Sequence, residues 1–80
     1  MSARQHSFEL KDFISHILEA IQRIEAYTNG LSFDDFSQST RDQDAVIRNF
    51  EVIGEACRNI ENHFPDFVAL HPELPIRSAL

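Results

Sequence analysis

Residues 41–64 carry a helical pattern that is apolar over far more than one face. The central stripe recurs at alternating steps of four and three residues and consists of Val46, Phe50, Ile53, Cys57, Ile60 and Phe64. The stripe is widened on one flank by Ala45, Val52 and Ala56, and on the other by Ile47 and Gly54. A surface helix normally carries an apolar stripe only somewhat wider than about 100°. This helix is therefore expected to bury two sides at once, against neighbours in its own fold or against a second copy of the chain.

A second amphipathic pattern predicts another long helix, from about Phe8 to Tyr27. Its apolar residues again recur at steps of four and three, as Leu10, Ile14, Ile17, Ile21 and Ile24. Ser7 is the expected N-cap, and Asn29-Gly30 supplies the left-handed residue that ends many helices. The chain has only two glycines and no strand-like alternation, so an all-α fold is expected. The two long helices predict a small up-and-down bundle that dimerisation completes.

The segment between the long helices predicts a short helical turn. Ser32 lies three residues before Asp35, which is the spacing of a helix cap. Phe33 and Phe36 of this turn are expected to pack inward.

A clearer capping box marks the start of the second long helix. Thr40 is expected to cap the amide of Gln43, whose side chain would reach back to Thr40. Pro65 is expected to end the helix, because a proline disfavours helical geometry in the preceding residue, Phe64.

The last sixteen residues contain all three prolines. Residues 67–70 predict one turn of helix, which an extended link follows, and a new helix is expected to begin near Ile76. That helix has barely started at Leu80, so residues 1–80 are expected to form a single domain that is incomplete at its C-terminus.

Composition excludes several classes of function. The formal net charge is −6, and the chain lacks the broad basic surface of a nucleic-acid binder. Any RNA contact would therefore have to be local and built from a few arginines. Cys57 is the only cysteine, which excludes an internal disulfide, and it is expected to be a small buried side chain in a reducing cytoplasm. We expect neither a signal peptide nor a membrane span. The four histidines lack metal-ligand spacing, so no metal or cofactor is expected.

The predicted self-association surface lies on the 41–64 helix. Its residues are Val46, Ile47, Asn49, Phe50, Ile53, Gly54 and Cys57. Asn49 interrupts the apolar stripe, and its amide would hold a neighbouring helix in register, face its copy across a dimer axis, or bond a loop carbonyl. Gly54 costs about 1 kcal/mol relative to alanine in mid-helix, which suggests close approach of another backbone. Arg48 has acidic neighbours one turn away, consistent with a surface ion-pair row or with an arginine lining a cleft.

The run from Asp44 to Ala56, followed by Phe64-Pro65 and by residues 71–76, resembles the HepT-like family of HEPN-domain proteins. The resemblance covers essentially the whole chain. It implies a small α-helical bundle that dimerises. It also implies kinship with metal-independent ribonuclease toxins, whose antitoxin is a minimal nucleotidyltransferase that attaches AMP to a toxin tyrosine.

The resemblance further implies an active motif of Arg-x-x-x-x-His-x-Tyr, in which histidine moves a proton and arginine holds a phosphate. In the family this motif follows the helix that starts after the Leu74-Pro75 link, where this chain has only a few residues. Tyr27, the only tyrosine, lies at the wrong place to accept AMP.

One literal match to the motif occurs earlier in the chain. Arg58, Asn59 and His63 have the spacing of the catalytic residues, although Pro65 stands in place of the tyrosine. The alternative is that Arg58 pairs with a nearby glutamate and His63 caps the helix.

The leading functional hypothesis is therefore a cytoplasmic HepT-like toxin component that forms a homodimer and binds a nucleotidyltransferase antitoxin. The 80-residue form is expected to be inactive, with RNA binding confined to full-length relatives. The alternative is a non-catalytic dimerisation or adaptor module for the nucleotidyltransferase, and a third hypothesis is a helical interaction protein unrelated to toxins.

Overall fold

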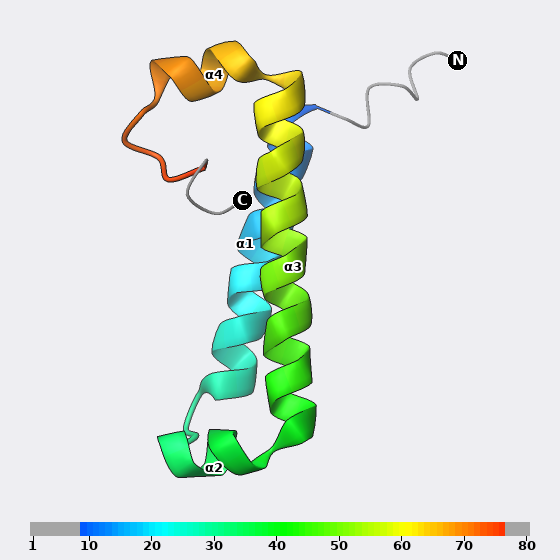
Figure 1. Ribbon diagram of the computed structural model, residues 1–80, viewed down its shortest axis with the longest axis vertical. Helices are drawn as coiled ribbons and strands as arrows, with labels where there is room; N and C mark the ends of the chain where they lie inside the picture. The colour runs from blue at the N-terminus through cyan, green and yellow to red at the C-terminus, as the bar shows by residue number, and fades with distance from the viewer. Residues whose placement is uncertain (1–8, 77–80) are drawn as a thin grey trace, which may run out of the picture.

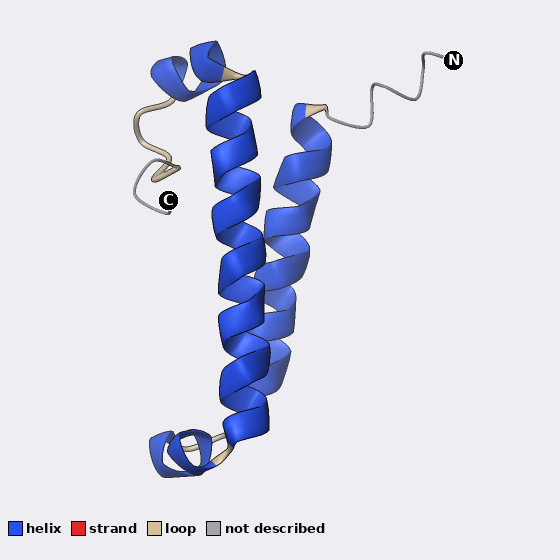
Figure 2. Cartoon of the chain, turned by 45° about the vertical axis from the view of Figure 1, so that its right-hand side comes forward, coloured by secondary structure: helices blue, strands red, loops and turns tan. Residues whose placement is uncertain are grey.

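The computed structural model describes residues 9–76, which form four α-helices and no strand (Figures 1 and 2). The helices are α1 (Leu10–Thr28), α2 (Phe33–Gln38), α3 (Thr40–His63) and α4 (Pro65–Leu70). The predicted all-α fold and both long helices are confirmed. The expected Ser7 cap and the continuation of a helix beyond Ile76 lie outside the described residues.

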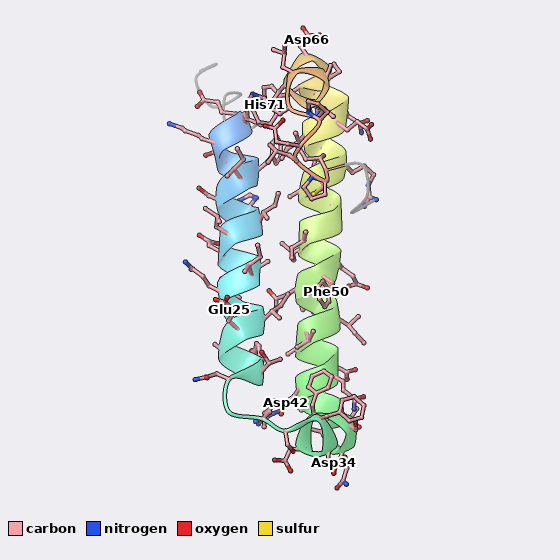
Figure 3. The ribbon with its side chains drawn as sticks, turned by 90° about the vertical axis from the view of Figure 1, so that its left-hand side faces the viewer. Glu25, Asp34, Asp42, Phe50, Asp66 and His71 are labelled. Carbon is pink, nitrogen blue, oxygen red and sulfur yellow. The ribbon has the colours of Figure 1, made fainter. Side chains whose placement is uncertain are left out.

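The helices α1 and α3 lie side by side and run antiparallel, with α2 at one end of the pair and α4 at the other (Figure 1). Side chains of both helices project into the space between them (Figure 3). The molecule measures 46 × 32 × 16 Å, and its radius of gyration is 15.2 Å. A compact domain of this length would have a radius of gyration of about 12 Å. The fold is therefore an elongated single layer of helices.

The end of α1 and the end of α3 follow their predicted stop signals. Gly30 adopts a φ of 80°, the left-handed conformation that a glycine favours after a helix. Phe64 has the non-helical angles φ −134° and ψ 56°, and Pro65 begins α4 immediately after it. Local sequence signals therefore determine both of these boundaries.

The predicted cap of α3 is wrong by one residue. Ser39, in extended geometry, is the N-cap, and its hydroxyl accepts a hydrogen bond from the Asp42 amide at 3.2 Å. Gln43 does not reach back to Thr40. Its side-chain amide donates to the carbonyls of Phe36 and Ser37, both at 2.8 Å. Gln43 thus satisfies the last carbonyls of α2, because the short helix turns back within its reach.

The short helix α2 is confirmed, but its inward packing is only half right. The Ser32 hydroxyl accepts from the Asp35 amide at 3.0 Å, as the spacing predicted. Phe36 is half-buried, whereas Phe33 is 82% exposed. Phe33 points away because a six-residue helix at the end of a two-helix layer has no further element to pack against.

The core gathers at the α4 end of the molecule. Its buried residues come from α1, α3, α4 and the segment after α4, and they are Phe13, Ala56, Cys57, Ile60, Val68 and Ile76. Ile60 is 1% exposed and lies at the centre of this cluster. The chain therefore folds back after α4, and the burial of Ile76 anchors the returning segment (Figure 1).

No helix within residues 9–76 has the length and apolar character needed to cross a lipid bilayer.

We expect Ser39→Ala to lower the free energy of unfolding by about 1 kcal/mol, because the Asp42 amide loses its capping oxygen. Thr40→Ala is the matched control and should change stability by only a few tenths of a kcal/mol, since alanine is a good helix former. Urea unfolding monitored by circular dichroism measures both. A larger loss for Thr40→Ala than for Ser39→Ala would restore the original capping assignment.

Candidate functional site

The three residues of the arginine–histidine motif lie in the last two turns of α3. Arg58 and His63 are exposed, and Asn59 is half-buried. Asn59 and His63 are four positions apart and share one side of the helix. Arg58 and His63 are five positions apart, which separates them by about 140° around the axis of a continuous helix. Within one protomer the structure therefore brings Asn59 and His63 together and leaves Arg58 on another side.

The ring of Phe13 organises two histidines beside this part of α3. The imidazole of His63 stacks parallel to the Phe13 ring, with centroids 6.2 Å apart and planes at 4°. The imidazole of His16, one turn along α1, meets the same ring edge-on at 6.5 Å. Phe13 itself is 5% exposed, so it is a buried spacer that positions both histidines.

A cleft between α1 and α3 opens next to this aromatic group. Its volume is about 280 Å³, and its lining residues are Phe13, His16, Val52, Glu55, Ala56 and Asn59. The floor is apolar, whereas His16, Glu55 and Asn59 contribute an imidazole, a carboxylate and an amide. Within residues 9–76, neither Glu55 nor Asn59 uses its side chain in a hydrogen bond or an ion pair. These two polar groups are therefore available to a ligand.

No motif in the sequence groups His16 with Glu55 and Asn59. The antiparallel packing of α1 against α3 is what brings His16 opposite the Glu55–Asn59 turn.

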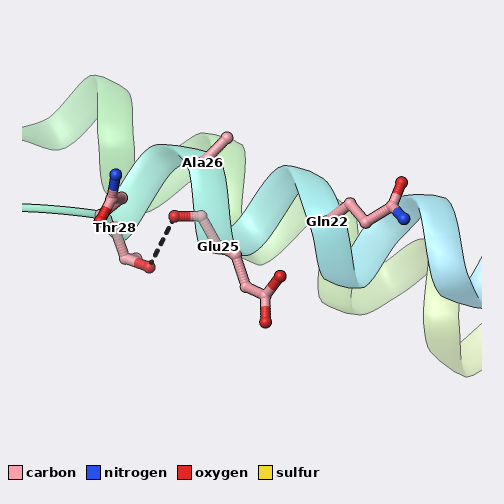
Figure 4. Close-up of a pocket in the computed structure, with 5 residues that line it drawn as sticks. Gln22, Glu25, Ala26 and Thr28 are labelled. Atoms are coloured by element: carbon pink, nitrogen blue, oxygen red, sulfur yellow. Dashed lines mark hydrogen bonds between the residues drawn. The ribbon is translucent and has the colours of Figure 1, made fainter.

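Two other depressions lack this combination of groups. One lies at the C-terminal end of α1, lined by Gln22, Glu25, Ala26, Thr28 and Asn29 (Figure 4). It is a shallow surface in which the Thr28 hydroxyl is already bonded to the carbonyls of Ile24 and Glu25, at 2.8 and 3.4 Å. The other is almost wholly apolar, and its lining residues are Ile14, Ile17, Ile60, Phe67, Leu74, Pro75 and Ile76.

The residues predicted for self-association fall into two groups. Val46, Asn49 and Cys57 are buried within the protomer, and Ile53 and Gly54 are half-buried. Two further members remain open in the single chain: Ile47 is 54% exposed and Phe50 is 58% exposed. Figure 3 labels Phe50 midway along α3. The buried members face α1, and the two exposed ones belong to the flank of α3 that α1 leaves uncovered.

Asn49 has a partner that none of the sequence alternatives included. Its side-chain amide donates to the carbonyl of Ala45, four residues earlier in the same helix, at 2.8 Å. The bond satisfies a buried polar group locally, so Asn49 need not reach a loop or a second chain.

No group of three or more potential metal ligands occurs within residues 9–76. The polar residues of the cleft, His16, Glu55 and Asn59, are of types that form hydrogen bonds, and histidine and glutamate can also transfer protons.

The sequence is similar to proteins of one family. The model of the family described as Ribonuclease HepT-like matches residues 17–78. A Thermococcus cleftensis protein named "Probable ribonuclease HepT" is 49% identical over 67 residues, which are 84% of this chain and 58% of that protein. A Methanocaldococcus jannaschii protein named "Gamma-glutamylcyclotransferase and putative RNase" is 48% identical over 56 residues, 70% of this chain and 25% of that protein.

A second Methanocaldococcus jannaschii protein, named "Putative RNase", is 39% identical over 67 residues, 84% of this chain and 53% of that protein. The chain thus covers less than two thirds of each of these relatives. No solved structure matches the chain at a significant level.

Burial raises the pKa of the Cys57 thiol, because the thiolate would lose its hydration. Below the ordinary thiol pKa, the folded and unfolded chains are both protonated and the shift has no effect on stability. Above about pH 8.5 the unfolded chain loses this proton first, so the free energy of unfolding should fall as the pH rises. Urea unfolding at a series of pH values measures the slope. Cys57→Ala should remove this component, and an unchanged slope in that variant would contradict the assignment.

Proposed function

The chain belongs to the HepT-like ribonuclease family, and from this we propose that it is the helical core of a HEPN-type toxin whose full-length form cleaves RNA. The match over residues 17–78 and the names of the relatives support this proposal. The antitoxin that we propose as its partner is a minimal nucleotidyltransferase. The chain covers little more than half of the Thermococcus cleftensis relative. RNA cleavage is therefore proposed for a full-length protein and not for these 80 residues alone.

We further propose that residues 1–80 alone do not cleave RNA. Metal-independent cleavage needs a proton-transferring histidine and a phosphate-holding arginine that meet at one phosphodiester. The observation that carries this point is the position of Arg58 and His63 on one unbroken helix, which turns the two side chains about 140° apart. We therefore do not expect the two side chains to meet at one phosphodiester within a single protomer.

Self-association is the second part of the proposal. The single layer of helices leaves apolar side chains of α1 and α3 open on the same edge, and these are Ile14, Leu18, Ile21, Ile47 and Phe50. Contiguous exposed apolar surface of this kind marks an interaction site in a soluble domain. A second copy packed on this edge would convert the two-helix layer into a four-helix bundle.

The same open edge favours a second candidate function, a non-catalytic adaptor. An adaptor needs a stable helical hairpin and an apolar docking surface, and the chain has both. The nucleotidyltransferase would then bind this edge directly, and a purified chain would be monomeric in its absence.

Incubation of the chain with single-stranded RNA should yield no cleavage products above the protein-free control, with ribonuclease A confirming that the substrate can be cut. The measurement is gel analysis of end-labelled RNA in the presence of EDTA. Cleavage that disappears in His63→Ala would refute the proposal and identify Arg58, Asn59 and His63 as an active motif.

Light scattering at a chain concentration on the order of tens of micromolar should give about twice the chain mass of 9.2 kDa. Phe50→Asp should give the single-chain mass, because a charge cannot be buried at the centre of an apolar interface. Leu70→Asp is the matched control, since Leu70 is also a large, exposed apolar residue but lies on α4. Monomeric wild-type protein would favour the adaptor function.

A further inference from the structure

The cleft beside Phe13 and the open apolar edge face opposite ways. On α1 the cleft is lined by His16, and the apolar depression is lined by Ile14. Residues two positions apart in a helix point about 200° apart. The cleft therefore stays accessible when a second copy or a partner covers the apolar edge.

The lining of the cleft suits a flat heteroaromatic ring. Val52, Ala56 and Phe13 give the cleft its apolar lining, and the His16 imidazole provides a planar group for stacking. Glu55 and Asn59, which contribute a carboxylate and an amide to the lining, lie one helical turn apart on α3. Proteins read unpaired RNA bases in this way, by stacking on a ring that includes histidine and by hydrogen bonding to the Watson–Crick edge.

We propose that this cleft binds an unpaired guanine of single-stranded RNA, which revises the expectation that only full-length relatives bind RNA. The Glu55 carboxylate only accepts hydrogen bonds, and guanine alone presents two adjacent donors on its Watson–Crick edge, the N1–H and the N2 amino group. The Asn59 amide can donate to guanine O6, the acceptor beside those donors. Adenine and cytosine place a ring-nitrogen acceptor next to their amino group, which would face the carboxylate with a repulsive lone pair.

The next phosphate along the strand has a partner on the same side of α3. Arg48 lies four residues before Val52, which is one turn or about 6 Å along the helix axis. Its exposed guanidinium can hold a phosphate through two parallel hydrogen bonds. The chain has a net charge of −6, so its overall charge does not attract the RNA backbone. The favourable electrostatic contact is confined to Arg48, and the contacts to the base therefore decide which strand binds.

The guanine site rests on the proposed function, because RNA is the substrate proposed for the full-length protein. Its test measures binding alone and does not require RNA cleavage. The probes are guanosine 5′-monophosphate and two uridine-rich RNA hexamers that differ by one central guanine or adenine. Nuclear magnetic resonance titration of the labelled chain follows the His16 and Asn59 side-chain signals. Fluorescence anisotropy measures the affinity for each hexamer.

The guanine hexamer should bind about tenfold more tightly than the adenine hexamer, and the mononucleotide should shift the His16 and Asn59 signals. Glu55→Gln should abolish the preference, because the glutamine amide has one acceptor and one donor side, which accepts from only one guanine donor and matches the N1 acceptor and amino group of adenine equally well. Glu51→Gln is the matched control, since Glu51 is an exposed glutamate one turn earlier on α3 that does not line the cleft.

Equal affinity for the two hexamers, or the same preference in Glu55→Gln as in Glu51→Gln, would overturn the guanine site. Neither result would change the outcome of the light-scattering or RNA-cleavage measurements, so the proposed function would stand. Conversely, RNA cleavage by the 80-residue chain would refute its proposed inactivity and leave the guanine preference intact.

Discussion

The packing of α1 against α3 is the interaction on which the rest of the structure depends. Most of the stability of a helix in a folded protein comes from the packing of its apolar face rather than from its intrinsic helix propensity. Phe13 from α1 and Ile60 from α3 meet in the buried cluster, and Val68 and Ile76 close it from the segment that follows. The returning chain therefore stabilises only one end of the pair, and the other end relies on α2 and its hydrogen bonds.

A single layer of two long helices has two open edges, and the edges differ in chemistry. One carries exposed isoleucines, a leucine and Phe50, and the other carries the cleft with His16, Glu55 and Asn59. Apolar surface gains free energy when it is covered, at roughly 25 cal/mol per Å². Polar groups without partners gain most from a ligand that offers complementary hydrogen bonds. The proposed roles, association on one edge and base binding on the other, follow from this difference.

Membership of a ribonuclease family does not assign chemistry to these particular residues. The literal motif at Arg58 and His63 has the right spacing in the sequence, yet a continuous helix turns the two side chains apart. His63 instead stacks on Phe13, in the packed end of the molecule. A spacing motif carries catalytic meaning only when the backbone between its residues brings them together.

The sequence by itself determined the two long helices, their stop signals at Gly30 and Pro65, and the family, because these depend on local periodicity and on residues adjacent in the chain. The capping pattern placed the N-cap of α3 at Thr40, one residue too late, because the neighbouring Ser39 carries an equivalent hydroxyl and takes that position. Only the tertiary structure decided that Gln43 bonds α2, that Phe33 stays exposed and that His16 joins Glu55 and Asn59 in one cleft. Those outcomes depend on how separate helices are placed relative to one another. Burial of apolar side chains across the whole chain determines that placement, and no local sequence pattern specifies it.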